Sequence, residues 1–100
     1  MPILTVRMEV PDAKGLSFTE GSFSVDLSDG RTITVPLAWY PRLLHSNPEE
    51  RNHWTLIGKG QGIHWENMDE DISVEGILAG RRSGESGPSL RRWLAARGIA

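Results

Sequence analysis

Histidines are the side chains of this sequence that could most directly bind a metal or move a proton, and their spacing favours neither role. His45, His53 and His64 lie 8 and 11 residues apart, whereas paired metal ligands on a helix recur at a spacing of about four residues. Ile63 and Trp65 flank His64, so strand alternation turns its imidazole away from their face. We therefore expect the three histidines to be surface or hydrogen-bonded side chains.

Carboxylates gather in one short stretch that could hold a hard cation. The cluster comprises Glu66, Asp69, Glu70 and Asp71. An EF-hand calcium loop needs a central glycine and a closing glutamate, and this stretch does not match that pattern. We expect residues 66–71 to form an acidic connector whose side chains are solvated or favour the N-terminal dipole of the following helix.

The sequence indicates neither a phosphate-binding loop nor a nucleophile. The glycines of Gly58-Lys-Gly-Gln-Gly62 precede a strand pattern, whereas a phosphate loop opens a helix whose N-terminus binds the anion. The chain has no cysteine, which excludes thiolate catalysis and cysteine zinc sites, and it has no GxSxG serine motif. We expect no catalytic residue, no metal and no cofactor, and hence a protein that is not an enzyme.

Aromatic and basic residues are the better lead, because tryptophan, tyrosine and arginine are enriched at the centres of protein interfaces. One aromatic pair lies at an expected strand-to-helix corner, and one tryptophan lies on a short terminal helix that must bury its apolar side. Trp54 and Trp65 alternate in phase with apolar neighbours and are expected in the core. The candidate partner-binding residues are Trp39, Tyr40, Arg42, Arg91, Arg92, Trp93 and Arg97.

Charge is distributed unevenly along the chain, although the formal net charge is only −2. Residues 1–80 contain six basic and twelve acidic side chains, while residues 81–100 contain five arginines and one glutamate. A basic tail can fold back on its acidic body, reach an acidic partner or contact nucleic acid. Folding back on the body, or plain solvation of the tail, is the simplest interpretation, and the acidic body argues against phosphate binding.

Alternating apolar residues in the first part of the chain predict strands. We expect one strand over residues 3–10, turn residues at 11–15 and a second strand over 16–19. A two-residue turn then places Phe18 opposite Phe23, which keeps the large apolar side chains on one face.

The next turn can be predicted from which residues must share a face. The pair Asp29-Gly30 is typical of a two-residue turn, but that turn would send Ile33 away from the core. A three-residue loop over 28–30 pairs Val25 with Ile33 and keeps the apolar face whole. We therefore predict the three-residue loop, with Gly30 at positive φ forming a bulge.

Short helices and two further strands are expected in the middle of the chain. Pro41 suits the first turn of one helix. A second helix is predicted by Asn47 as its cap and Glu50 as the acid of a capping box. The strands expected after them cover residues 54–57 and 62–65.

The last part of the chain predicts two helices separated by a linker. Asp71 or Ser73 can cap a helix over residues 74–78. Residues 81–88 are rich in glycine and serine and predict a flexible linker. Ser89 would then cap a terminal helix. The apolar side of that helix comprises Leu90, Trp93 and Leu94.

These patterns predict one small α+β domain, an antiparallel β-sheet with short helices packed on it and a C-terminal helix after a flexible linker. Its parts are the α+β domain over residues 1–80, the linker over 81–88 and the C-terminal helix over 89–98. No apolar run approaches the roughly 20 residues that span a bilayer, and the N-terminus lacks the pattern of a signal peptide. We expect a cytoplasmic protein that does not enter a membrane.

Four sequence blocks carry a family resemblance. They are Asp29-Gly-Arg-Thr-Ile-Thr-Val-Pro-Leu-Ala-Trp-Tyr-Pro-Arg-Leu-Leu44, Trp54-Thr-Leu-Ile-Gly58, Gly62-Ile-His-Trp65 and Asp69-Glu-Asp-Ile-Ser-Val-Glu-Gly-Ile-Leu-Ala-Gly-Arg81. In this order, over roughly residues 3–81, they resemble the bacterial domain of unknown function 2442 family. The resemblance implies a small antiparallel α+β domain and no activity that can be assigned to particular residues.

A partner is also implied by this resemblance. Some members resemble one half of a two-gene pair, an arrangement similar to toxin–antitoxin modules. We therefore expect a non-enzymatic protein-interaction module, antitoxin-like or regulatory, whose protein partner is encoded next to it. A homodimer and a nucleic-acid-binding protein that acts through the Arg-rich C-terminal tail are the alternatives. Other members carry a helix-turn-helix after the domain, for which the roughly 20 residues after Gly80 are too few.

Overall fold

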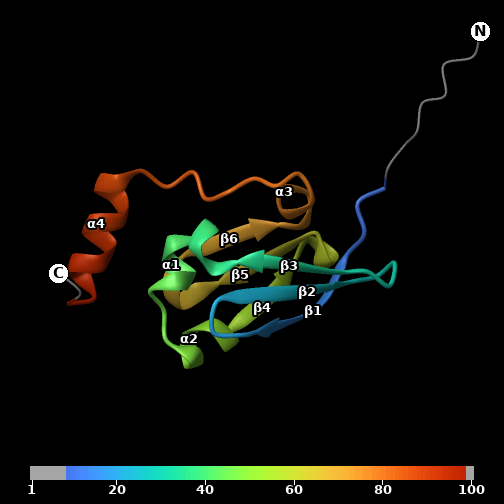
Figure 1. Ribbon diagram of the computed structural model, residues 1–100, viewed down its shortest axis with the longest axis horizontal. Helices are drawn as coiled ribbons and strands as arrows, with labels where there is room; N and C mark the ends of the chain where they lie inside the picture. Colours follow the sequence, from blue (N-terminus) through green and yellow to red (C-terminus); the bar gives the residue numbers. More distant parts are fainter. Residues whose placement is uncertain (1–8, 99–100) are drawn as a thin grey trace, which may run out of the picture.

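Two three-stranded antiparallel sheets form the domain, and the computed structural model describes residues 9–98 (Figure 1). The first sheet has the strand order β1 (Ala13–Phe18), β2 (Ser22–Leu27) and β3 (Thr32–Pro36). The second has the order β4 (Trp54–Ile57), β5 (Gly62–Trp65) and β6 (Glu70–Ser73). The predicted α+β class is confirmed, with the strands divided between two sheets.

Short helical segments connect the strands or follow the last of them. The α-helices are α1 (Pro41–Leu44), α2 (Pro48–Asn52), α3 (Val74–Leu78) and α4 (Gly87–Ala96). Single 3-10 turns are η1 (Leu37–Trp39), η2 (Gly58–Gly60) and η3 (Glu66–Met68). Among the helices of residues 9–98, none is long and apolar enough to cross a membrane.

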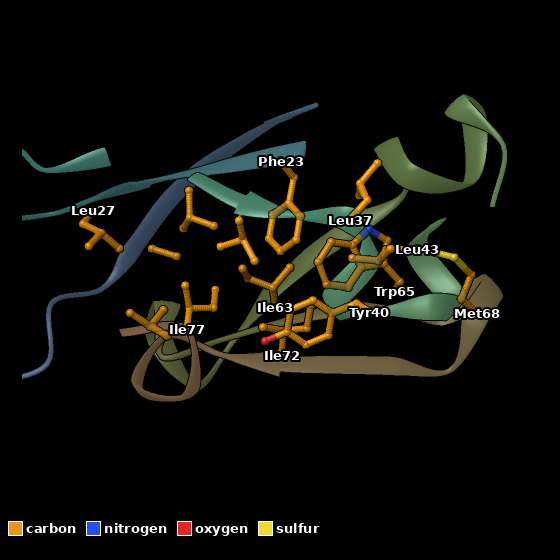
Figure 2. Packing of buried hydrophobic residues seen from close by; sticks show 14 residues of the cluster. Phe23, Leu27, Leu37, Tyr40, Leu43, Ile63, Trp65, Met68, Ile72 and Ile77 are labelled. Carbon is orange, nitrogen blue, oxygen red and sulfur yellow. The ribbon is translucent and has the colours of Figure 1, made fainter. Parts of the chain in front are cut away.

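The core lies between the two sheets (Figure 2). Phe23 of β2 and Trp65 of β5 meet edge to face across it, with ring centroids 6.4 Å apart. Trp65 is fully buried, and its indole N–H donates to the carbonyl oxygen of Arg51 at 3.0 Å. The predicted core position of Trp65 is confirmed, while Trp54, opposite it in the ladder, is half-buried against the core.

The first two hairpins have the predicted registers. Val25 pairs with Ile33, and the amide of Leu27 donates to the carbonyl oxygen of Arg31 at 2.8 Å, which closes a three-residue loop. Gly30 in this loop has a φ of 92°, as predicted. The requirement that apolar side chains share one face therefore selects the correct loop, where the Asp-Gly pair alone suggests another.

The chain enters the first sheet earlier than its turn residues suggest. The strand predicted over residues 3–10 lies mostly outside the described residues, and its two described residues have no strand structure. The turn predicted over residues 11–15 is wrong from Ala13 onward, because β1 begins there. An irregularity in the ladder between Ala13 and Gly15 absorbs the residue between them. Pairing with β2 thus overrides the turn propensity of this segment.

An acidic segment expected to be a connector contains a strand. The connector predicted over residues 66–71 is wrong in its second half, where Asp69 at a φ of 49° turns the chain into β6. Ile72 of β6 pairs with Ile63 of β5, and both side chains are buried. The ladder and this burial outweigh the low strand propensity of the neighbouring acids.

The helix caps in the body of the domain are the predicted ones, whereas the cap of the terminal helix is not. Asn47 and Glu50 form the predicted capping box of α2, and Ser73 caps α3. The prediction that Ser89 caps the terminal helix is wrong, because the side chain of Ser86 accepts from the amide of Ser89 at 3.2 Å. Helix α4 therefore begins earlier than predicted, with a proline in its first turn, where a missing N–H costs nothing.

Gly60 allows η2 to approach the start of β1. Its φ is 91°, and a Cβ there would lie 2.8 Å from the carbonyl oxygen of Ala13. Gly60→Ala should therefore lower the free energy of unfolding by about 2 kcal/mol, measured by equilibrium urea unfolding. Gly21→Ala is the matched control, because a Cβ there meets nothing within 4 Å. Equal losses in the two variants would contradict this account of Gly60.

Candidate functional site

The C-terminal segment folds back along the domain (Figure 1). Residues 81–98, called the tail below, pass edge strand β6 and bring α4 beside α1. The amide of Ser83 donates to the carbonyl oxygen of Trp39 at 2.9 Å. The hydroxyl of Tyr40 donates to the carbonyl oxygen of Arg81 at 2.8 Å. These two bonds fasten a stretch that the sequence predicts to be a flexible linker.

Arg42 of α1 forms the first ionic connection between the domain and the tail. Its Nε and Nη2 donate to the carboxylate of Glu85 at 2.9 and 2.6 Å, and its Nη1 donates to the carbonyl oxygen of Met68 at 2.7 Å. The two charged side chains are only 16% and 11% exposed. The hydrogen bond from Arg42 lowers the pKa of Glu85 below its ordinary value, so this carboxylate stays charged.

Arg97, just after α4, forms the second ionic connection. Its Nη1 and Nη2 donate to the two carboxylate oxygens of Glu50 at 2.6 and 2.5 Å. One of these oxygens also accepts from the amide of Asn47 at 3.0 Å, so the capping box of α2 and the tail share a carboxylate. The hydrogen bond from Arg97 lowers the pKa of Glu50.

Trp93 lies between the two connections. The guanidinium carbon of Arg42 is 5.3 Å from the centre of its ring, and that of Arg97 is 4.6 Å away. Both distances fit cation–π attraction. The pattern is reciprocal, because an arginine of the domain holds a glutamate of the tail and an arginine of the tail holds a glutamate of the domain.

The candidate residues from the sequence separate into three groups. Arg42, Trp93 and Arg97 come together, but within the chain itself. Tyr40 is buried in the core, and Trp39 is half-buried beneath the guanidinium of Arg82, which lies 4.9 Å from its ring centre. Two candidates remain exposed on α4, Arg91 and Arg92.

Glu50 and Glu85 belong to this arrangement and are absent from the candidates drawn from the sequence. The signal that could have suggested them is the opposite net charge of the tail and the body. Folding back, the simplest interpretation of that asymmetry, is what the structure contains. The partners of each pair are 43 and 47 residues apart, so no local pattern joins them.

A pocket of about 180 Å³ lies between β6 and the tail. Its walls include all four residues of β6 and the tail residues 81–84, and Tyr40 lines it as well. Glu70 of β6 is half-buried in this pocket. Burial raises its pKa to about 7, although the charge of Arg42 acts in the opposite direction.

The histidines take no part in the tail contacts described above. His64 points away from the core, as predicted, and its Nδ1 lies within hydrogen-bond distance of the carboxylate of Asp71 on the neighbouring strand. Within residues 9–98, the structure brings together no three histidine, aspartate or glutamate side chains that could hold a metal ion.

Comparison with known families agrees with this fold. The model of the family described as protein of unknown function (DUF2442) matches residues 13–83. The chain belongs to this family. The matched region of this DUF2442 protein includes both sheets and ends before α4, so Glu85, Trp93 and Arg97 lie outside it.

Solved structures place this DUF2442 protein beside two bacterial proteins without an assigned function. A crystal structure of a protein of unknown function from Rhodospirillum rubrum has 27% identity and a TM-score of 0.66, covering 75% of this chain and 93% of that one. An uncharacterised protein from Chromobacterium violaceum, solved in solution, has 23% identity and a TM-score of 0.63, covering 89% of this chain and 78% of that one. No curated protein matches the chain.

Proposed function

We propose that this DUF2442 chain is a non-enzymatic protein-interaction module, the antitoxin-like or regulatory half of a two-protein bacterial system, with α4 as the arm that binds the partner. The observation that carries the proposal is how α4 is held. None of its ten residues is buried, and its large apolar residues Leu90, Trp93 and Leu94 are only half-buried. A helix this short is marginally stable alone, so its apolar side gains from a second surface.

The kinds of contact that hold the tail suit an arm that can leave the domain and bind a partner. Ion pairs and cation–π contacts hold α4 to the domain, and no residue of the helix is fully buried there. Arg91 and Arg92 remain exposed on the helix. An acidic surface on the partner would complement them and speed its association.

Co-expression with the protein encoded beside this chain tests the proposal. We expect the two proteins to copurify, and deletion of residues 82–100 to abolish the complex. Loss of binding should occur while the remaining domain still unfolds cooperatively in a circular dichroism melt. A complex that survives the deletion, or two proteins that do not bind each other, would refute the proposed role of the tail.

A pair of point variants tests the same role with less disturbance. Leu94→Asp places a charge on the half-buried side of α4, and Ala96→Asp places the same charge on its exposed side. We expect the first variant to weaken binding at least tenfold and the second to change it little, measured by titration calorimetry. Equal effects of the two variants would indicate that general charge, and not the apolar side of α4, determines binding.

Nucleic-acid binding is the second candidate, favoured by the exposed arginines of the tail. Arg81, Arg82, Arg91 and Arg92 are exposed, and Arg82 stacks on an aromatic ring as residues that contact bases do. Binding of this kind would weaken steeply with salt and would decrease in the variant with Arg91→Ala and Arg92→Ala. A fluorescence anisotropy titration at low ionic strength that detects no binding would remove this candidate.

A further inference from the structure

Glu70 lies where the edge strand, helix α1 and the tail meet. It stands on β6 opposite Trp65 in the ladder, and its side chain lines the pocket of about 180 Å³ that the tail covers. Tail residues 81–84 form part of the wall of this pocket. The tail therefore supplies part of the surroundings that keep this carboxyl group half-buried.

Charged groups from every neighbouring element act on Glu70. Arg42 of α1 attracts its negative form, and Glu85 of the tail repels it. The acids on either side of it along the chain, Asp69 and Asp71, repel it as well. The other polar groups lining the pocket are Tyr40, Ser73, Arg81, Arg82 and Ser83. Glu70 and Glu85 therefore compete for one guanidinium.

We infer that Glu70 is a proton-operated latch for the tail, whose neutral form keeps the tail docked and whose ionised form releases it. The latch regulates the partner-binding arm of the proposed function, and its biological purpose rests on that function. Its action does not, because the tail docks on the domain of the same chain and needs no partner.

The protonation state of Glu70 determines how many carboxylates attract the guanidinium of Arg42. With Glu70 neutral, Arg42 is committed to the carboxylate of Glu85 and the carbonyl oxygen of Met68. With Glu70 ionised, a second carboxylate attracts the same guanidinium and repels Glu85. Release of the tail removes Glu85 and exposes Glu70 to water, so the released state favours the ionised form.

The direction of the pH dependence follows from this difference. Glu70 has a pKa of about 7 with the tail docked, and release should return it towards its ordinary value of 4.5. The docked state therefore holds the proton more tightly, and docking is favoured as the pH falls through 7. If Glu70 is the only group involved, the ratio of docked to released tail should rise about tenfold between pH 8 and pH 6.

Carbon-bound NMR signals of α4 in the isolated full chain can follow this change, because they do not exchange with water at high pH. The methyl signals of Leu90 and Leu94 should move with a midpoint near pH 7, and Glu70→Gln should hold them at the docked position throughout. Glu75→Gln, which changes an exposed acid on α3, is the matched control and should titrate like the wild type. A histidine effect would persist in Glu70→Gln and would overturn the inference.

Titration of the Glu70 carboxyl carbon provides a second test. In Glu85→Gln its pKa should fall clearly below 7, because the repelling carboxylate is gone and Arg42 is free to pair with Glu70. An ordinary pKa in the wild type, or tail signals that do not change with pH, would refute the latch. Either result would leave partner binding untouched, and a failed copurification would leave the latch untouched, so the two ideas can fail separately.

Discussion

Trp65→Ala should lower the free energy of unfolding by about 3–5 kcal/mol, a large fraction of the about 5–15 kcal/mol that is typical of a whole domain. The indole is fully buried between the sheets and meets Phe18 and Phe23 edge to face. Its removal would leave a cavity and would also leave the carbonyl oxygen of Arg51 without its donor. Equilibrium unfolding in urea, followed by circular dichroism, measures the loss.

Trp54→Ala is the control for this experiment. Trp54 pairs directly with Trp65 in the ladder, but it is half-buried. Trp54→Ala should lower the free energy of unfolding by less than half as much as Trp65→Ala, because less apolar surface is removed from contact. Losses of equal size would show that the position between the sheets does not determine the effect.

Arg42→Leu should detach the tail at every pH. The substitution leaves the carboxylate of Glu85 and the carbonyl oxygen of Met68 without their donor and removes one cation from the ring of Trp93. Removing one partner of a buried pair costs about 3–5 kcal/mol, and partial exposure reduces this to about 2–3 kcal/mol for docking of the tail. Hydrogen exchange should accelerate at the amides of α4 and remain unchanged in β5.

Arg31→Leu is the matched control for Arg42→Leu. Arg31 also pairs with a carboxylate, that of Asp29, but the two side chains are 51% and 39% exposed. An ion pair this exposed adds little to stability, because water and salt screen it, and this one makes no contact with the tail. If Arg31→Leu accelerated exchange in α4 as much as Arg42→Leu, the specific role of Arg42 would be disproved.

Local and pairwise patterns in the sequence predicted the parts of the fold that depend on few residues. The capping box of Asn47 and Glu50 lies within four consecutive residues, and its geometry needs no other element. The loop at Gly30 followed from the faces of two adjacent strands. In both cases the deciding interactions are short in sequence, so the sequence contains what is needed to find them.

The parts that were missed depend on contacts from elsewhere in the chain. Glu70 and Asp71 have low strand propensity, and only the ladder with β5 makes them part of a strand. Helix α4 begins with a glycine and a proline, two residues that are typical of a linker. The structure shows that Ser86 caps the helix in front of them. For the site, the sequence nominated Arg42, Trp93 and Arg97 for contacts with a partner. It could not reveal that these residues meet within one chain.

The ionic fastening of the tail has a consequence for calorimetry. The heat capacity of unfolding follows the apolar surface that becomes exposed, and α4 adds little to it because none of its residues is buried. Lifting the tail from the domain would therefore change the curvature of stability with temperature much less than opening the two sheets would. Dissolved ions screen partly exposed charges, so ionic strength acts on the tail more than on the core. Temperature would thus act mainly on the two sheets, and the ionic composition of the surroundings on the position of the tail.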